Sequence, residues 1–172
     1  AVSGNNIYGF AKNPDSKNIT DVLDWGGVKW KTLEYAFTGS NISNITAGAP
    51  DLSECWSLEG TFQDCESFNG DLTAWDVKHV RNMRNTFKNA KAFSSDISGW
   101  NVQAVSDMSG MFMNATAFAT DLTKWGDRVQ NVANMENTFQ GATAFNYNLG
   151  LWKLKSVKKI GIGNSGISGE NY

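Results

Sequence analysis

The chain has 172 residues, of which 41% are hydrophobic, and its 15 basic and 17 acidic side chains give a formal net charge of −2. The length is that of one ordinary domain, and the hydrophobic content is too high for a disordered chain. The near balance of charge argues against nucleic acid and anionic membranes as partners. No apolar run reaches twelve residues, so we expect no membrane span in this segment.

Three segments follow one another along the chain. Residues 1–18 show no internal period, and we expect an N-terminal cap segment there. Residues 19–159 repeat and form the main body. Residues 160–172 begin a further unit without finishing it, so we expect the start of a C-terminal cap. This cap either continues beyond Tyr172 or folds over the end of the repeats, because a bare end would expose core.

The main body repeats with a fixed period that lengthens slightly once, near the end. Phe37, Phe62, Phe87 and Phe112 are each 25 apart, and Phe139 follows after 27. Because successive copies share this register, residues of one column are expected to lie above one another in a common interior. Further columns keep the same steps, namely Leu33, Leu58, Met83, Met108 and Met135; Trp75, Trp100, Trp125 and Trp152; Val80, Val105, Val132 and Val157; Phe68, Phe93, Phe118 and Phe145; Leu72, Ile97, Leu122 and Leu149.

The spacing inside one unit suggests its local structure. The apolar residues of the segment 80–93 are separated by 3, 4, 3 and 3 positions, which is the stripe of a short helix with one buried face. The segment Asp96–Gly99 has the length of a short strand. We therefore predict an α/β repeat solenoid of the leucine-rich-repeat type, with about five or six coils. Short parallel strands would line one face and short helices the other.

The candidate binding residues are those expected to lie on the strand face. Thr73, Ser98 and Thr123 form a small polar column beside the buried Leu column, and Lys124 neighbours it. Trp56 lies off the repeated aromatic columns, which makes it the aromatic side chain most expected to be exposed. We interpret these five residues as candidates for ligand binding.

A column of acidic residues is the strongest candidate for a metal site. Asp71, Asp96 and Asp121 recur once in each period, Asp21 lies two periods before Asp71, and Asn148 takes the last position. Stacked carboxylates could coordinate Ca²⁺. We favour the alternative that each side chain accepts backbone hydrogen bonds at a bend, because Asn does this as well as Asp.

No catalytic residues can be proposed. His79 is the only histidine, and no nucleophile or acid is placed around it by spacing. Cys55 and Cys65 fall on the Val and Ala columns, so we expect two free buried thiols rather than a disulfide. We therefore predict neither an enzyme nor a cofactor or metal.

The columns resemble a known family. The segments MSGMFMNATAFATDLTKW and LEGTFQDCESFNGDLTAWDVKHV are similar to the BspA-like leucine-rich repeat family, in its 25-residue branch of mycoplasma-type DUF285 surface protein repeats. The opening ITDVLDWGGVKWKTLEYAF and the closing NSGISGENY also resemble the segments that flank the repeats in that family. The resemblance covers about residues 19–172. It implies a solenoid in a secreted or cell-surface bacterial protein, often part of a larger adhesin.

The function expected from these patterns is binding without chemistry. We predict a ligand-binding or adhesion module that presents a solenoid face to a protein or glycan of a host or neighbouring cell, and that contacts other domains of its parent protein. The alternative is a structural spacer that only holds other domains apart. A binding face should expose an apolar or aromatic patch, whereas a spacer should be evenly polar.

Overall fold

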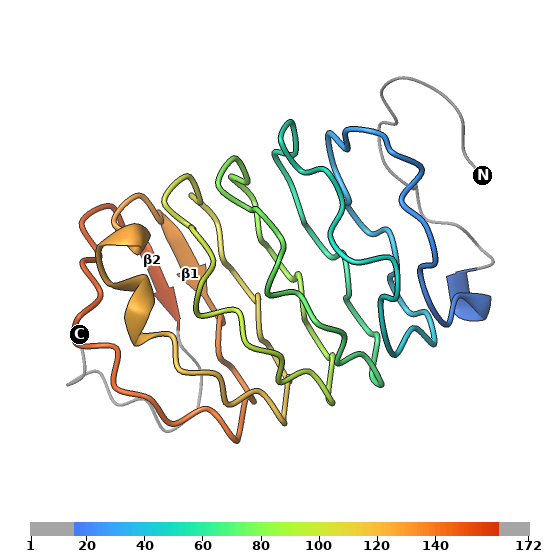
Figure 1. Cartoon of the computed structure of the whole chain (residues 1–172). Helices are drawn as coiled ribbons and strands as arrows, with labels where there is room; N and C mark the ends of the chain where they lie inside the picture. The colour runs from blue at the N-terminus through green and yellow to red at the C-terminus, as the bar shows by residue number, and fades with distance from the viewer. Residues whose placement is uncertain (1–15, 162–172) are drawn as a thin grey trace.

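A computed structural model describes residues 16–161, in which successive turns of the chain lie side by side in a row (Figure 1). We number five coils by residues, with coil 1 at 31–55, coil 2 at 56–80, coil 3 at 81–105, coil 4 at 106–132 and coil 5 at 133–157. The first residues of successive coils are joined by backbone hydrogen bonds, as between the Arg81 N–H and the Trp56 carbonyl at 2.8 Å. Regular elements in the described part are short, namely the 3-10 helices η1 (Ser16–Asn18) and η2 (Thr123–Val129) and the strands β1 (Asn134–Glu136) and β2 (Lys159–Gly161).

A parallel backbone ladder joins the coils. Strands β1 and β2 are paired in parallel with Met135 opposite Ile160. Isolated parallel bridges continue the same line through the earlier coils at Thr32, Ser57, Asn82, Asp107 and Asn134. Four N–H groups of coil 3 donate to carbonyls of coil 4, from Met83 to Asp107, Asn85 to Ser109, Phe87 to Met111 and Asn89 to Met113.

The position of this ladder differs from the strand expected at Asp96–Gly99, where the structure has no strand. There the chain bends, because the Ser98 N–H donates to Asp96 Oδ1 at 2.9 Å. A side chain that accepts the backbone N–H two residues on competes with strand pairing. The ladder instead lies beside the Leu/Met column.

The helices expected on the other face are also absent from residues 16–161, apart from the two 3-10 segments. In the segment 80–93, Asn85 and Asn89 have φ of 53° and 60°. Two left-handed residues four positions apart cannot belong to one right-handed helix. The 3, 4, 3, 3 apolar spacing therefore reflects a chain of tight turns that places every third or fourth side chain inside.

The interior is built of stacked rings. Phe87 is fully buried, and its ring lies 5.6 Å from Phe62, 5.8 Å from Phe112 and 3.8 Å from Phe93 of its own coil, with planes within 6° of parallel. The Leu/Met, Val and Trp columns are buried alongside, except that Val157 is only partly buried. The shared register thus corresponds to a shared dry interior in coils 1–5, where burial of apolar area supplies most of the stability.

Two kinds of buried polar side chain tie neighbouring coils together. The indole Nε1 of Trp100 donates to the Leu72 carbonyl of coil 2 at 3.0 Å. The buried Thr86 hydroxyl lies 2.8 Å from the Met83 carbonyl of its own coil and 3.1 Å from the Leu58 carbonyl of coil 2. Because a buried polar group without a partner is costly, these contacts specify the spacing of the coils.

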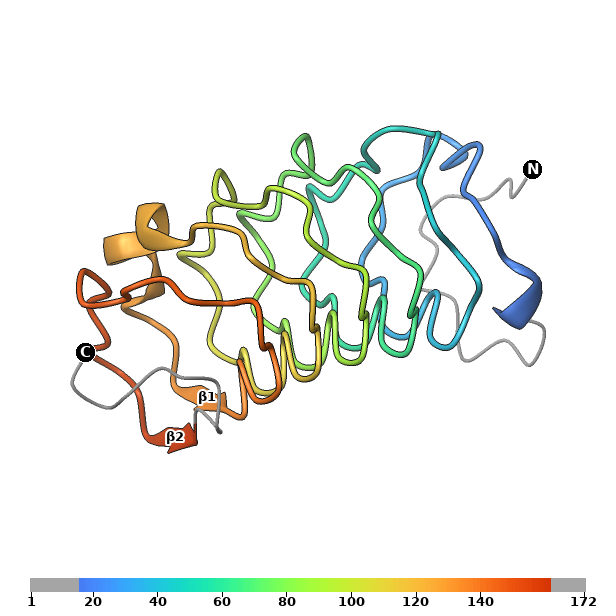
Figure 2. The ribbon, with the colours of Figure 1, turned by 90° about the horizontal axis from the view of Figure 1, so that it is seen from below.

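Two irregularities are accommodated without breaking the stack. Pro50 occupies the Trp position of coil 1, and the buried ring of Trp25, two periods before Trp75, lies 5.8 Å from Trp75. The two extra residues of coil 4 fall within η2, on the opposite side of the molecule from β1 and β2 (Figure 2). The ladder resumes after η2, where the Ala133 N–H donates to the Ser106 carbonyl.

Candidate functional site

The polar column predicted for ligand binding is largely engaged within the protein. Thr73 is exposed, and its hydroxyl donates to Asp71 Oδ1 at 2.7 Å. Thr123 is half-buried, and its N–H donates to Asp121. Ser98 is buried, with 6% of its surface accessible, so its placement on an exposed face is wrong. Thr73 has the same bend but is exposed, so the bend is not the cause; next to Ser98, the Arg128 guanidinium of η2 donates to the Gly99 and Trp100 carbonyls and covers this part of coil 3.

The remaining two predicted residues lie in different places. Lys124 is exposed in η2, and its charge helps to lower the pKa of Asp96 and Asp121. Trp56 is 48% exposed, as expected for an aromatic outside the repeated columns. It directly precedes the bridge residue Ser57, on the ladder that leads to β1. Because η2 and β1 lie on opposite sides (Figure 2), the five predicted residues do not form one site.

The side chains of Asp71, Asp96 and Asp121 accept hydrogen bonds from backbone N–H groups. Hydrogen bonds from the N–H and hydroxyl of Thr73 lower the pKa of Asp71, and the residues two positions after Asp96 and Asp121 do the same there. Asn148 accepts the equivalent N–H from Gly150 at 2.7 Å. Within residues 16–161, no three His, Cys, Asp or Glu side chains gather closely enough to hold a metal ion. The geometry therefore favours the bend interpretation over Ca²⁺ coordination.

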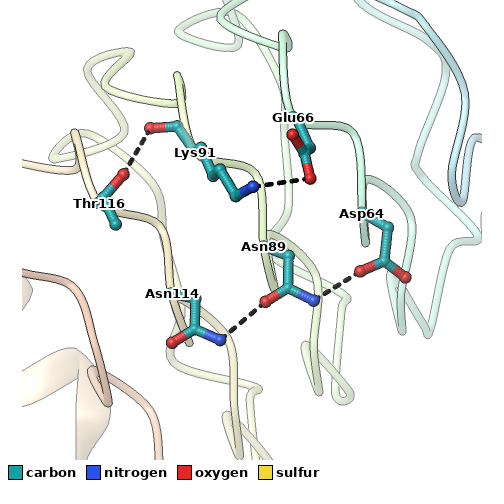
Figure 3. Close-up of polar contacts among 6 residues, drawn as sticks. All are labelled: Asp64, Glu66, Asn89, Lys91, Asn114 and Thr116. Carbon is teal, nitrogen blue, oxygen red and sulfur yellow. Dashed lines mark hydrogen bonds and ion pairs between the residues drawn. The ribbon is translucent and has the colours of Figure 1, made fainter.

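A second polar column, which sequence analysis did not single out, runs across coils 2 to 4. The amide of Asn114 donates to Asn89 Oδ1 at 2.9 Å, and that of Asn89 donates to Asp64 Oδ1 at 2.6 Å (Figure 3). All three have φ near +60°, so short polar side chains serve both the left-handed turn and the hydrogen-bond ladder. These side chains are occupied with one another and stabilise the stack.

Several cations are paired with a neighbouring carboxylate. Lys91 Nζ lies 2.8 Å from Glu66 Oε1 in the neighbouring coil, beside the second polar column (Figure 3). Similar ion pairs join Lys29 to Glu54, Lys78 to Asp76 and Lys153 to Asp127. These exposed pairs contribute little stability each, but they neutralise the surface on which they lie.

Coil 3 carries a group of cations without such partners. Arg81, Arg84 and Lys88 follow the spacing 3 and 4, and in the described part of the chain their side chains form neither an ion pair nor a hydrogen bond. Arg81 and Arg84 are exposed and Lys88 is half-buried. Arg81 directly follows Trp56 along the ladder, since its N–H donates to the Trp56 carbonyl. A cationic surface with an adjacent exposed aromatic ring thus lies over coils 2 and 3.

Beside these cations the surface is hollowed. A depression of about 440 Å³ spans coils 3 to 5. Gly110 forms part of its lining and has φ of 62°, and a Cβ added there would collide with Asn85 Oδ1. The absence of a side chain at Gly110 therefore helps to keep the hollow open. Polar and charged side chains line it, namely Arg84, Asn85, Lys88, Ser109, Asn134, Glu136 and Asn137.

The two cysteine thiols lie in the interior, away from this surface. Burial raises the pKa of Cys55 to about 11 and also raises that of Cys65, so neither thiol is reactive at neutral pH. Both are free and buried, as expected. His79 is exposed, on a different surface position from the depression. The sequence shows the spacing of Arg81, Arg84 and Lys88, but it does not show whether a carboxylate lies beside them. For this reason these residues were not predicted as a site.

Family membership follows from the repeat region. Residues 31–152 match the family described as Mycoplasma protein of unknown function, DUF285, which covers coils 1 to 4 and most of coil 5. No curated protein and no solved structure matches the chain significantly. No helix among residues 16–161 has the length and apolar character needed to cross a membrane. Since more than half of its residues match, the chain belongs to the DUF285 family of mycoplasma proteins.

Proposed function

We propose that the chain is a non-catalytic binding module, an LRR-like repeat solenoid of the BspA-like 25-residue branch, in a secreted or surface-exposed bacterial protein. It presents a rigid face to a protein or glycan of another cell. One observation carries this proposal: coil 3 places three cations, which have no ion partner among residues 16–161, next to an exposed Trp56 and a polar depression. By contrast, Lys91 in the same coil is neutralised by a carboxylate within the molecule.

The rigidity of the stack supports binding through a preformed surface. The depression is lined by residues of three coils that are joined by backbone hydrogen bonds and by packed rings. A surface of this kind loses little conformational entropy when it binds, which favours affinity. Binding energy would come from a few anchors, as in other recognition surfaces.

A structural spacer is the second candidate, and one observation favours it. The exposed large apolar side chains of the described part are Leu23, Trp56, Tyr147 and Leu151, which are distributed between the segment before coil 1, coil 2 and coil 5. This distribution gives no broad apolar patch for a tight protein partner. A spacer would need no such patch and no group of unpaired cations.

An array test separates the two candidates. The purified chain is applied to panels of glycans and of extracellular matrix proteins, with Arg84→Gln/Lys88→Gln as a matched variant. A binding module gives saturable binding on at least one panel that the variant weakens. Absence of binding on both panels, with a cooperative unfolding transition showing that the protein is folded, would favour the spacer.

A further inference from the structure

The cations of coil 3 and the depression beside them point to a particular ligand chemistry. We propose, on the basis of the binding function above, that the depression holds a uronate residue of an acidic polysaccharide, with Arg84 and Lys88 contacting its carboxylate. The cations supply the charge, and the polar lining supplies partners for the hydroxyl groups of the sugar.

The anionic part of the ligand follows from the missing partners. Arg84 and Lys88 lie at the edge of one depression, and neither side chain forms an ion pair or hydrogen bond within the described residues. A guanidinium presents paired N–H donors that match a carboxylate. A bound carboxylate therefore displaces no internal partner, whereas at Lys91 it would have to compete with Glu66.

The sugar part follows from the rest of the lining. Asn85 offers an amide, and Glu136 on coil 5 offers a carboxylate acceptor. The Ser109 hydroxyl and the Asn134 amide donate to Asp107, so these two side chains offer a ligand their remaining acceptor capacity. Such groups pair with hydroxyls, while Glu136 would repel a second carboxylate placed near it. Met113 is the apolar side chain among the lining residues. The volume of about 440 Å³ lies in the usual range of small-ligand sites.

Two other polyanions fit less well. Nucleic acid is held by many phosphate contacts, whereas coil 3 offers three cations that lack an ion partner in the described part of a chain whose net charge is −2. An acidic peptide would gain most of its affinity from apolar anchors in pockets, and the lining has little apolar surface to receive them.

Trp56 extends the surface by one coil. It is 48% exposed and adjoins Arg81 along the ladder. An indole ring with an accessible apolar face can pack against the C–H groups of a pyranose. A polymer lying along the stack would therefore contact coil 2 through Trp56 and coils 3 to 5 through the depression, so binding should strengthen with chain length.

The experiment measures binding of polygalacturonate to the whole chain by isothermal titration calorimetry, with neutral dextran and poly-glutamate as comparison ligands. We expect saturable binding of polygalacturonate, weakened by added salt, and no binding of dextran. Arg84→Gln/Lys88→Gln should lower the affinity at least tenfold, about the loss of one charge-assisted hydrogen bond. Lys91→Gln and Lys153→Gln, which remove paired cations, should change it less than about twofold.

The outcomes separate this inference from the broader function. Equal binding of dextran, or unchanged binding by Arg84→Gln/Lys88→Gln, would overturn the uronate site while leaving a binding module in place. Binding of poly-glutamate as tight as that of polygalacturonate would overturn the sugar class. A chain that binds no glycan and no protein on the arrays would overturn both proposals. Circular dichroism and thermal unfolding confirm that each variant folds, and Trp56→Ala tests the flanking contact separately.

Discussion

Coil 1 forms the same backbone hydrogen bonds to the next coil as coils 3 and 4 do, but its interior is filled by different side chains. In coils 3 and 4 each Trp indole donates to a carbonyl of the preceding coil, from Trp100 to Leu72 and from Trp125 to Ile97. In coil 1 the Trp position is Pro50, and the next indole, Trp75 Nε1, is buried without a hydrogen-bond partner. The ladder tolerates the loss of one Trp and of one indole hydrogen bond, because backbone hydrogen bonds do not depend on side-chain identity.

The contrast teaches that the repeat has two separable sources of order. The backbone ladder sets the rise from coil to coil, while the ring stacks and indole hydrogen bonds set how well each layer is filled. Trp25 compensates for Pro50 by reaching Trp75 across two periods. Apolar filling is therefore restored in coil 1, and the Trp25 indole donates to the Gly48 carbonyl at 3.0 Å, whereas the Trp75 indole of coil 2 is left without a partner.

Removing a ring from the best-filled layer gives the largest expected effect. Phe87→Ala should lower the free energy of unfolding by about 3–5 kcal/mol, because a fully buried ring leaves a cavity between Phe62 and Phe112. Phe37→Ala should cost less, since the position in coil 1 equivalent to Phe93 is Ser43. Urea unfolding measures both. An equal loss for the two variants would show that coil 1 is packed as tightly as coil 3.

A glycine pair separates backbone strain from crowding. Gly39→Ala places a side chain at φ of 68° with nothing near its Cβ, so only the strain of roughly 1–2 kcal/mol is expected. Gly110→Ala adds a collision with Asn85 Oδ1 and should cost more. Thermal unfolding of the two variants gives the difference. If Gly110→Ala were no less stable than Gly39→Ala, Asn85 would have to move freely, and the depression would not be preformed.

The indole hydrogen bond can be isolated by a matched pair. Trp100→Phe removes the bond to the Leu72 carbonyl, whereas Trp75→Phe removes no bond and relieves a buried N–H. Trp100→Phe should therefore be the more destabilising by about 1 kcal/mol or more. Both substitutions remove a similar side-chain volume. The difference between their free energies of unfolding, measured by chemical denaturation, therefore reports the contribution of the indole hydrogen bond. A more destabilising Trp75→Phe would contradict the assignment.

The Asp column gives the smallest expected effect on stability, and this effect is seen only at acidic pH. Backbone hydrogen bonds lower the pKa of Asp71, Asp96 and Asp121 in the folded chain below the ordinary value of 3.8. Their contribution is present above that value and is lost as the pH falls through the folded pKa values. The thermal midpoint should thus decline below about pH 4.

The matched variant carries Asn at all three positions, as the chain itself does at Asn148, where the side chain accepts the same N–H. Because Asn does not titrate, the acid decline should become shallower while the midpoint at neutral pH changes little. An acid decline of unchanged steepness would assign it to other carboxylates. Added Ca²⁺ should leave the wild-type midpoint unchanged if the column serves only the bends.

The sequence alone determined which side chains share the interior. Phe87, Met108 and Trp125 could be assigned to it because each period of the repeat recreates the same environment, and all three are buried. The two free buried cysteines and the exposed Trp56 followed from the same register. Their physical basis is simple, since a residue that repeats in step with buried neighbours must be buried with them.

Only the tertiary structure decided how the backbone runs between those positions and which charges remain unpaired. The left-handed Asn85 and Asn89 replace the expected helix by turns, and the ladder lies at Asn82 rather than at Ser98. Likewise, Lys91 is neutralised by Glu66 of the preceding coil, while Arg84 has no ion partner among the described residues. Pairing between coils depends on contacts across a full period, and the periodicity of a single chain does not specify them.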